Sequence, residues 1–329
     1  MEPLASEGTS GRQGGSKLAV EDLLSQGVVI GVLATGVRLA APFLFASLGE
    51  MFAQRSGVFN LGVEGIMMMG AFTGFLVTLR MGNPYLGVAV AILVGAVLGL
   101  LMAFISVTMQ AEQGISGIGL YMFCWGLSGL LFRIYVGFIT SIKGFGPVHV
   151  PVLSRIPVIG PILFQHNWLV YLALALVPVS WFVLYKTTWG LKVRAVGTTP
   201  EAADTLGVNV NAIRYECVIL GSALAGLAGA FLTVGQANMY ADNITAGRGF
   251  IAVALVYFGR WSPVGILAGS LLFSMMNALQ LWIQVLGINF PYEFAVILPY
   301  VMTIAALAVA VRHVWAPAAL GKPFEREAS

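Results

Sequence analysis

The chain has 329 residues, of which 58% are apolar and only 9% are charged, with 40 glycines and a formal net charge of +3. Soluble domains carry a charge at roughly a quarter of their positions, so this composition excludes an ordinary soluble domain. The small positive charge is not gathered into a basic patch, which argues against a nucleic-acid-binding protein. The composition therefore indicates an integral membrane protein.

The residue types that build metal and catalytic centres are sparse and scattered. Cys124 and Cys217 lie inside apolar runs, and His149, His166 and His313 stand alone. Neither a disulfide framework nor a metal site is expected from this pattern. No glycine-rich nucleotide-binding motif is present, so we expect no cofactor in this chain and no enzymatic activity of its own. Any ATP that drives this protein has to be bound by a partner chain.

Nine apolar segments follow a polar segment at 1–26. A bilayer core of about 30 Å requires roughly 20 helical residues. The segments lie at 27–48, 58–79, 84–108, 114–136, 167–187, 212–235, 248–259, 263–286 and 293–312. They predict an all-α, polytopic bundle of about eight to ten transmembrane helices over 27–312, followed by a tail at 313–329. Small residues four apart, such as Gly95 and Gly99, indicate close helix packing.

Basic residues set the expected orientation. The densest group lies in and around the loop at 187–213, and more basic residues follow in the tail: Lys186, Lys192, Arg194, Arg214, Arg312, Lys322 and Arg326. The positive-inside rule places this loop and the tail in the cytoplasm and, by counting spans, the amino terminus outside. A bacterial or archaeal type of cytoplasmic membrane is expected. Arg38, inside the first apolar segment, should face the bundle interior or lie near an interface.

The stretch at 49–71 carries polar groups that a simple membrane anchor would not keep. Asn60 and Glu64 are four residues apart and share one helix face, and Gly62 and Gly65 interrupt the same run. A carboxylate within the membrane is costly and marks a site. Glu64 either faces a cavity or a partner, or accepts hydrogen bonds that lock a broken helix.

A second unusual stretch, at 241–263, contains an apolar run of about a dozen residues, which is too short to span a bilayer comfortably. Arg248 stands between Gly247 and Gly249 at its start. The run predicts a short helix that is buried in protein or returns to the side from which it came. Arg248 either pairs with Glu64 or extends to the outer interface.

The basic loop contains its own helix signals. The residues that favour a helix start and stop are a threonine cap, a proline, an acidic residue and a terminal glycine, at Thr199, Pro200, Glu201 and Gly207. They predict a two-turn helix within the loop. Ala202 and Ala203 are expected on its exposed faces, where they are small enough to let another protein approach closely. A helix this short is stable only when it docks on something.

Three stretches together resemble a known family: GEMFAQRSGVFNLGVEGIMMMGA, GLKVRAVGTTPEAADTLGV and ITAGRGFIAVALVYFGRWSPVG. They are similar to signature stretches of permease subunits of ABC importers for nucleosides and simple sugars, within the wider ribose and branched-chain amino-acid permease family. The resemblance runs from about 27 to 312. Gln54 departs from it, because the family often has an acid before the arginine of this motif, and a local ion pair with Arg55 is therefore in question.

The resemblance implies a permease that pairs with a second permease, itself or a sister chain, around a translocation path. An extracytoplasmic binding protein would deliver the solute, and partner ATPase subunits would bind ATP and Mg. The implied coupling residues are Gly190, Leu191, Arg194, Ala195, Gly197, Pro200, Glu201, Ala202 and Ala203. The implied path-lining or bracing residues are Asn60, Gly62, Glu64, Gly65, Gly247, Arg248 and Gly249. A nucleoside is the preferred solute, and a ribose- or galactose-type sugar stays open.

Two other functional classes are weighed against this one. An ion-coupled secondary transporter would use Glu64 as its proton or sodium site and would need no docking helix in the loop. A membrane-embedded enzyme would need a constellation of His, Asp or Cys, which the sequence lacks. Tyr121, Phe123 and Trp125 either stack on a base or sugar face or simply pack within the bundle.

Overall fold

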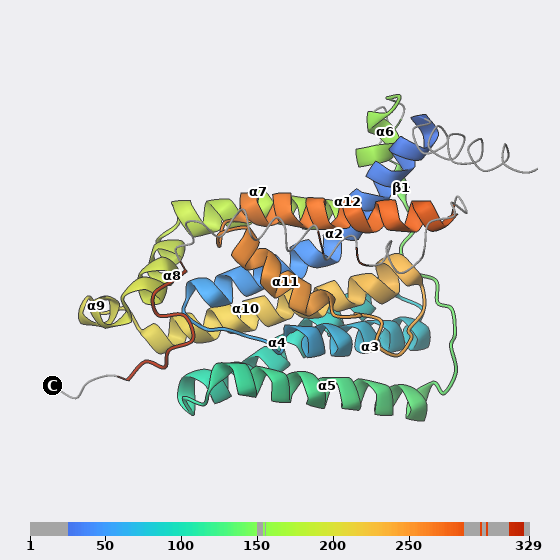
Figure 1. Cartoon of the computed structure of the whole chain (residues 1–329). Helices are drawn as coiled ribbons and strands as arrows, with labels where there is room; N and C mark the ends of the chain where they lie inside the picture. The colour runs from blue at the N-terminus through green and yellow to red at the C-terminus, as the bar shows by residue number, and fades with distance from the viewer. Residues whose placement is uncertain are drawn as a thin grey trace, which may run out of the picture.

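The computed structural model describes residues 26–149, 154, 156–285, 297, 301 and 316–325, which form a helical bundle (Figure 1). Seven helices in this part of the chain are long and apolar enough to cross a membrane. They are α2 (Gln26–Arg55), α3 (Val63–Met81), α4 (Pro84–Ala103), α5 (Gln113–Tyr135), α7 (Trp168–Lys186), α10 (Val210–Ala230) and α12 (Pro263–Val285). The predicted polytopic helical membrane protein is confirmed, while the segments at 1–25 and 293–312 lie essentially outside the described residues.

Shorter elements lie between these spans. α4 and α10 continue as the π-helical turns η1 (Phe104–Thr108) and η3 (Phe231–Ala237), and the short helices are α6 (Ile159–Leu163), α8 (Thr188–Thr198), α9 (Pro200–Thr205) and α11 (Arg248–Phe258). Two short strands, β1 (Val148–His149) and β2 (Gln165–His166), pair antiparallel. Figure 1 places α8 and α9 at one end of the bundle and β1 and α6 at the other. These are called the α8–α9 end and the β1–β2 end.

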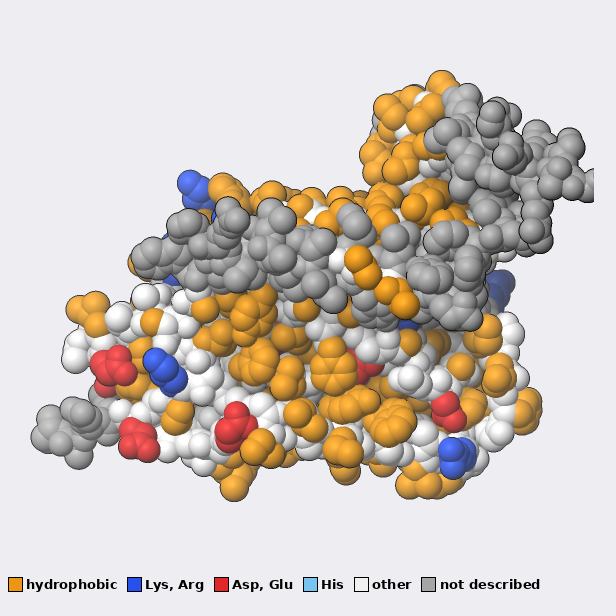
Figure 2. Space-filling view, in the orientation of Figure 1, with side chains coloured by type: hydrophobic (Ala, Val, Ile, Leu, Met, Phe, Trp, Pro, Cys, Tyr) orange, Lys and Arg blue, Asp and Glu red, His pale blue; other side chains and the backbone are white. Residues whose placement is uncertain are grey.

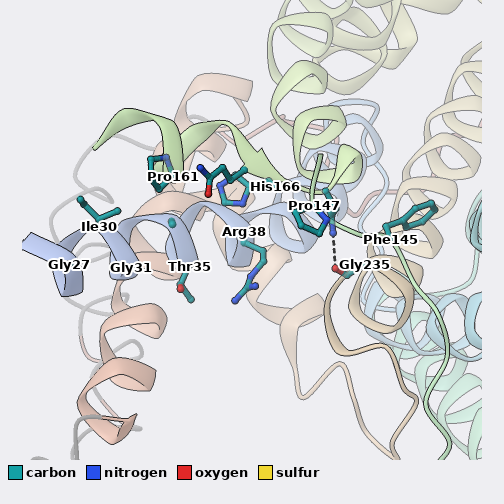
Figure 3. A pocket seen from close by; sticks show the side chains of 13 residues that line it. Gly27, Ile30, Gly31, Thr35, Arg38, Phe145, Pro147, Pro161, His166 and Gly235 are labelled. Atoms are coloured by element: carbon teal, nitrogen blue, oxygen red, sulfur yellow. Dashed lines mark hydrogen bonds between the residues drawn. The ribbon is translucent and has the colours of Figure 1, made fainter. Parts of the chain in front are cut away.

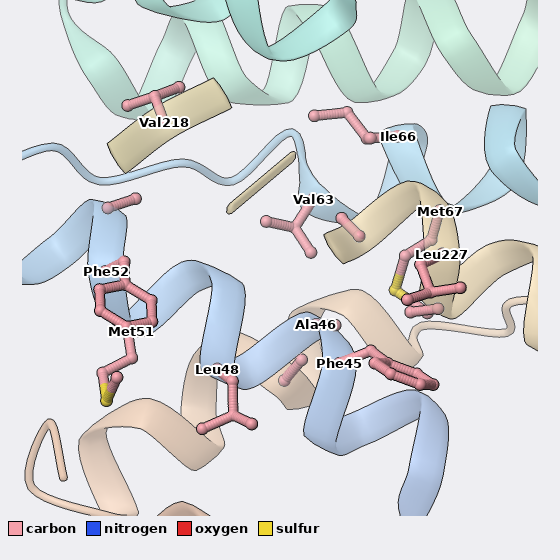
Figure 4. Packing of buried hydrophobic residues seen from close by; sticks show 14 of the residues in the cluster. Phe45, Ala46, Leu48, Met51, Phe52, Val63, Ile66, Met67, Val218 and Leu227 are labelled. Atoms are coloured by element: carbon pink, nitrogen blue, oxygen red, sulfur yellow. The ribbon is translucent and has the colours of Figure 1, made fainter. Parts of the chain in front are cut away.

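α10 is the central helix of the bundle and packs on α2, α3 and α4, whereas α5 lies at the edge beside α3 (Figure 1). In the most apolar stretch of α10 and η3, 78% of the residues are buried, whereas in that of α5 only 28% are buried. Figure 4 shows side chains of the main core cluster from three helices, among them Phe45 and Leu48 of α2, Met67 of α3 and Leu227 of α10. In the face shown in Figure 2, apolar side chains are gathered over the middle of the bundle, with other residue types between them.

Small residues allow the central helices to approach closely, as the sequence predicts. A Cβ atom at Gly99 of α4 would lie 2.7 Å from Oγ of Ser222 in α10, and one at Gly221 would lie 2.7 Å from the carbonyl oxygen of Gly49 in α2. Any larger side chain would push these backbones apart. The van der Waals packing that holds helices together in lipid depends on such approaches.

The start of α3 differs from the prediction, because α2 continues to Arg55 and α3 begins only at Val63. The non-helical residues 57–62 instead run beside α5. The amide of Phe59 donates to Oε1 of Gln113 (2.8 Å), at the first residue of α5. A Cβ at Gly65 would lie 2.6 Å from Cα of Tyr121, in the first half of α5. Tyr121 lies eight residues, or about 12 Å, after the start of α5, which is about 34 Å long, so α3 starts beside the first third of α5.

A second non-helical segment, at 238–247, runs back toward the same depth from the β1–β2 end. Its Tyr240 ring lies 4.9 Å from the ring of Phe132 in α5. Further along, the ring of Phe250 in α11 lies 5.2 Å from that of Tyr121. α3 and α11 therefore both begin beside the first half of α5, near Tyr121. The short apolar helix predicted near 248–259 is confirmed as α11.

Residues 316–325 lie across the α8–α9 end of the bundle. The amide of Ala319 donates to the carbonyl oxygen of Gly197 in α8 (3.0 Å). Nη1 of Arg214 donates to the carbonyl oxygen of Lys322 (3.0 Å). Arg214 is only 1% exposed and belongs to the first turns of α10, so it is a buried anchor for this segment and not an exposed loop cation.

Candidate functional site

Glu64, in the first turn of α3, joins the starts of α3 and α11. Its side chain is 1% exposed. Oε1 accepts hydrogen bonds from Oγ1 of Thr245 (2.6 Å) and from the amide of Gly247 (2.8 Å). Oε2 accepts one from the amide of Gly249. The first amides of a helix have no partner within the helix and favour negative charge, so the carboxylate caps α11 inside the bundle.

The glycines around Arg248 are required by geometry. Gly247 has φ +80°, in the left-handed region that other residues rarely adopt. A Cβ at Gly249 would lie 2.5 Å from Cα and 2.6 Å from the amide nitrogen of Glu64. The two helix starts can therefore touch only because position 249 has no side chain.

The remaining path candidates gather at the same point. Gly62 precedes α3, and its amide donates to Oδ1 of Asn60 (2.9 Å). The Asn60 side chain is 1% exposed. The guanidinium of Arg248 donates to the carbonyl oxygens of Ile244 (2.9 Å) and Thr245 (3.1 Å). The structure thus brings the two predicted groups together and favours the locking role for Glu64. The direct pairing of Arg248 with Glu64 stays a prediction.

A chain of buried polar side chains lies between this junction and the α8–α9 end of the bundle, and it was not predicted from the sequence. Glu50 and Gln54 of α2 are 1% and 0% exposed. Nε2 of Gln54 donates to Oε1 of Glu50 (2.9 Å), and Oε1 of Gln54 accepts from Nε1 of Trp261 (2.8 Å). An amide can donate and accept at once, whereas an ionised acid can only accept, which explains why glutamine suits position 54. The amide of Asn60 also donates to Glu50 (3.1 Å).

Arg55 connects this chain to the α8–α9 end. Its Nε donates to the carbonyl oxygen of Trp261 (2.9 Å), and its Nη2 approaches the hydroxyl of Tyr185 in α7 at 3.5 Å. The guanidinium of Arg194 in α8 lies over the same tyrosine ring. A Cβ at Gly197 of α8 would overlap the carbonyl oxygen of Arg55. α8 is therefore seated directly on the end of α2.

The predicted coupling residues divide by exposure. Gly190, Gly197, Pro200 and Ala203 are buried, Arg194 and Ala195 are half-buried, and Leu191, Glu201 and Ala202 are exposed. The buried members fix α8 and α9 on the bundle. The exposed members form the outer surface of the loop.

The predicted loop helix is confirmed as α9, and Gly207 follows it with φ +80°. Two details of the prediction are wrong. Thr199 makes no side-chain capping bond, because its backbone leaves α8 directly into α9. Ala203 is 3% exposed, because that face of α9 packs on the main core. α8 was not predicted, although Thr187 caps it by accepting from the amide of Gly190 (3.1 Å).

Two leucines stand out on the α8–α9 loop. Leu206, directly after α9, is 84% exposed, and Leu191 of α8 is 59% exposed. Leu191 was among the predicted coupling residues, whereas Leu206 was not. The sequence feature that could have indicated Leu206 is an apolar residue between Thr205 and Gly207 in an otherwise polar turn. Large apolar side chains this exposed on a polar loop are candidates for contact with another protein.

A polar cavity of about 470 Å³ lies at the β1–β2 end (Figure 3). Its lining includes Thr35 and Arg38 of α2 with Gln165, His166 and Asn167. Arg38 lies 17 residues before the end of α2, or about 25 Å along the helix. It therefore lies toward the β1–β2 end and is exposed there. Of the two positions that the sequence left open for Arg38, this agrees with the one near an interface.

This cavity predicts a pH dependence of stability. Burial lowers the pKa of His166, and the positive charge of Arg38 lowers it further, despite the bond between its Nε2 and the carbonyl oxygen of Ile162 (2.8 Å). The folded state therefore favours neutral His166. Stability is fully present above the unfolded pKa of about 6.5 and is lost as pH falls below it toward the folded value. Thermal unfolding of purified protein at pH 7.5 and pH 5.5 should show a smaller acid shift in His166→Gln; an unchanged shift would contradict this assignment.

Residues 32–307 match the family model described as branched-chain amino acid transport system permease component. The guanosine ABC transporter permease protein NupQ of Bacillus subtilis is 35% identical over 297 residues, which cover 87% of this chain and 93% of that protein. The nucleoside ABC transporter permease protein NupC of Lactococcus lactis is 36% identical over 301 residues, with 88% and 95% covered.

A sugar-system relative is equally similar. The candidate glucose ABC transporter permease protein TsgC13 of Haloferax volcanii is 39% identical over 324 residues, which cover 90% of this chain and 98% of that protein. No solved structure was found to match the chain.

Proposed function

Because the chain belongs to the family of branched-chain amino acid transport system permease components, we propose that it is the membrane-spanning permease subunit of an ATP-binding cassette importer for a nucleoside or sugar. The observation that carries this proposal is similarity to permeases of such systems over most of the chain, with the family model matching residues 32 to 307. The seven apolar spans supply the multi-pass body that such a subunit needs.

The α8–α9 loop is the proposed docking site for the partner ATPase subunit. It lies on the cytoplasmic side together with residues 316–325, and the amino terminus lies outside. Exposed Leu191, Ala202 and Leu206 contact the ATPase, while buried Gly197 passes the movement to α2. ATP and Mg are bound by that partner. Coupling needs a rigid connection of this kind, because a packed contact transmits displacement without absorbing it.

The junction at Glu64 braces the translocation path. It fixes the starts of α3 and α11 to each other, so both move as one body when α2 moves. Both oxygens of Glu64 accept bonds from α11 and the segment before it, which supports bracing over the ion site of a secondary transporter. Alternating access then follows from rigid-body movement against a second permease, a sister chain or a second copy.

A nucleoside is the preferred solute, and a sugar is the alternative. Two of the similar permeases are named for guanosine or nucleosides and one for glucose. An extracytoplasmic binding protein delivers the solute and contributes most of the selectivity.

Affinity purification of the tagged chain from its native membrane tests the proposal. An ATPase subunit and a second permease should copurify, and the reconstituted complex should take up guanosine or glucose only with ATP and the binding protein. A chain that purifies alone and transports under an ion gradient would overturn the proposal in favour of an ion-coupled transporter.

Leu206→Asp tests the docking site. The side chain is 84% exposed, so we expect Tm to stay within about 2 °C of the original while recovery of the ATPase subunit and uptake both fall about 10-fold. Met81→Asp is the matched control. Met81 is 67% exposed and is the last residue of α3, at the end of the bundle away from the α8–α9 loop. Recovery of the ATPase should be unchanged in the control. Equal recovery in both variants would remove Leu206 from the docking site.

A further inference from the structure

One outer face of the bundle combines an unwound backbone with polar side chains. Asp242 and Asn243, in the non-helical segment before α11, are both exposed. The segment runs beside the half of α5 nearer the β1–β2 end, where a Cβ at Gly129 would lie 3.9 Å from Oδ1 of Asp242. Gly129 lies six residues before the end of α5, or about 9 Å along the helix. The polar segment therefore lies within the depth that α5 spans.

Lipid cannot cover such a surface. Within the hydrocarbon core, irregular backbone is tolerated only where it is buried in protein or lines a water-filled cavity. An exposed carboxylate and amide at this depth likewise have to contact protein or water and not lipid. Exposed apolar side chains of α4, such as Leu93, and of α5, such as Ile134, suit lipid. The strip where Asp242 and Asn243 lie against α5 does not, and it therefore faces water or another protein.

An aromatic platform lies next to this polar segment. The rings of Tyr121 and Trp125 are stacked, with centroids 6.3 Å apart and an angle of 10° between their planes. The Phe250 ring meets Tyr121 edge-on at 5.2 Å. Trp125 is 48% exposed, and a Cβ at neighbouring Gly126 would have nothing within 4 Å. Trp125 and Gly129 are four residues apart on one face of α5, so this partly exposed π surface lies about one helical turn from the Asp242 carboxylate.

We propose that this α5–α11 face, made of Tyr121, Trp125, Gly126, Asp242, Asn243 and Phe250, is a wall of the solute path. Its chemistry fits a neutral ring-bearing solute with hydroxyl groups. The Trp125 and Tyr121 platform stacks on the flat face of a base or sugar ring. Asp242 and Asn243 bond hydroxyl groups at the edge. The inference rests on the proposed function and assigns the solute contact to residues that the family resemblance did not imply.

Thiol labelling of the assembled complex in membranes tests whether water reaches this face. Buried Cys124 and Cys217 are first replaced by alanine, and Gly126→Cys and Asn243→Cys are compared with Leu93→Cys on α4. A charged thiol reagent reacts only with hydrated thiolate. We expect both face variants to react at least about 10-fold faster than Leu93→Cys, and excess guanosine or glucose with the binding protein to slow them. Reaction no faster than that of Leu93→Cys would overturn the proposal.

Uptake by the same complex tests the stacking platform. Trp125→Ala should lower uptake about 10-fold, as expected for the loss of one ring–ring stack, whereas Trp125→Phe should stay within about 2-fold. Trp181→Ala is the matched control, because Trp181 of α7 is 42% exposed but lies away from this face. A greater loss for guanosine than for glucose identifies base stacking, and the reverse identifies a sugar face. Equal uptake by Trp125→Ala and Trp181→Ala would contradict the platform.

The two proposals fail separately. Recovery of the ATPase subunit and ATP dependence test the proposed function, and none of the α5–α11 variants should change that recovery. An intact complex with an unreactive face would reject the solute wall alone.

Discussion

Glu64→Ala is expected to destabilise the protein by about 3–5 kcal/mol and to abolish uptake. The substitution leaves the amides of Gly247 and Gly249 and the hydroxyl of Thr245 without their acceptor inside the bundle. Water cannot replace the carboxylate there without opening the contact between α3 and α11. Thermal unfolding in mild detergent should show Tm lowered by about 10 °C or more.

Glu64→Gln separates charge from shape. An amide keeps one carbonyl oxygen but turns an NH₂ group toward an N–H donor, so we expect an intermediate loss of Tm and uptake. Glu216→Ala is the control, since exposed Glu216 accepts a single bond from Nε1 of Trp189 (2.7 Å) and should change Tm little. A Glu64→Ala protein with unchanged Tm would show that the carboxylate does not hold the two helices. Loss of uptake with unchanged Tm would instead support an ion site.

Gly197→Ala is expected to uncouple ATP hydrolysis from uptake. The new Cβ would overlap the carbonyl oxygen of Arg55, so α8 has to move away from α2. That shift also strains the bond from the amide of Ala319 to the carbonyl oxygen of Gly197 (3.0 Å). We expect a loss of about 1–3 kcal/mol and an uptake at least about 10-fold lower.

The measurement for Gly197→Ala is ATPase activity of the reconstituted complex with and without the solute-loaded binding protein. Stimulation should disappear while basal hydrolysis persists. Gly119→Ala is the matched control, because a Cβ at Gly119 has nothing within 4 Å and alanine favours the helix by up to about 1 kcal/mol. Normal stimulation in Gly197→Ala would show that movement does not pass through this contact.

Local patterns predicted most of the described spans, because long apolar runs and flanking polar residues report directly on burial in lipid. The junction at Glu64 was predicted only in parts. Its two halves, around Glu64 and around Gly249, are more than 180 positions apart in sequence, and no local pattern pairs them. Their unusual composition marked each half, but only the packing of α3 against α11 shows which groups bond.

The polar chain through Glu50 and Gln54 was missed for a different reason. Two polar residues four apart read as the end of a span and the start of a loop. In the structure they bond to each other and to Trp261, so the helix continues through them to Arg55. α8 was missed because its mixed sequence has no long apolar face. Its stability comes from its seat on α2 and not from its own propensity.

The half-length of α11 bears on how the chain enters the membrane during synthesis. Eleven residues provide about 16 Å of helix, too little to partition into a bilayer as an independent span. Its first amides also need the carboxylate of Glu64, which is synthesised earlier. We therefore expect α11 to enter as part of a hairpin with α12, packed against α2 and α3. Insertion of the α11–α12 hairpin would then depend on prior assembly of α2 and α3.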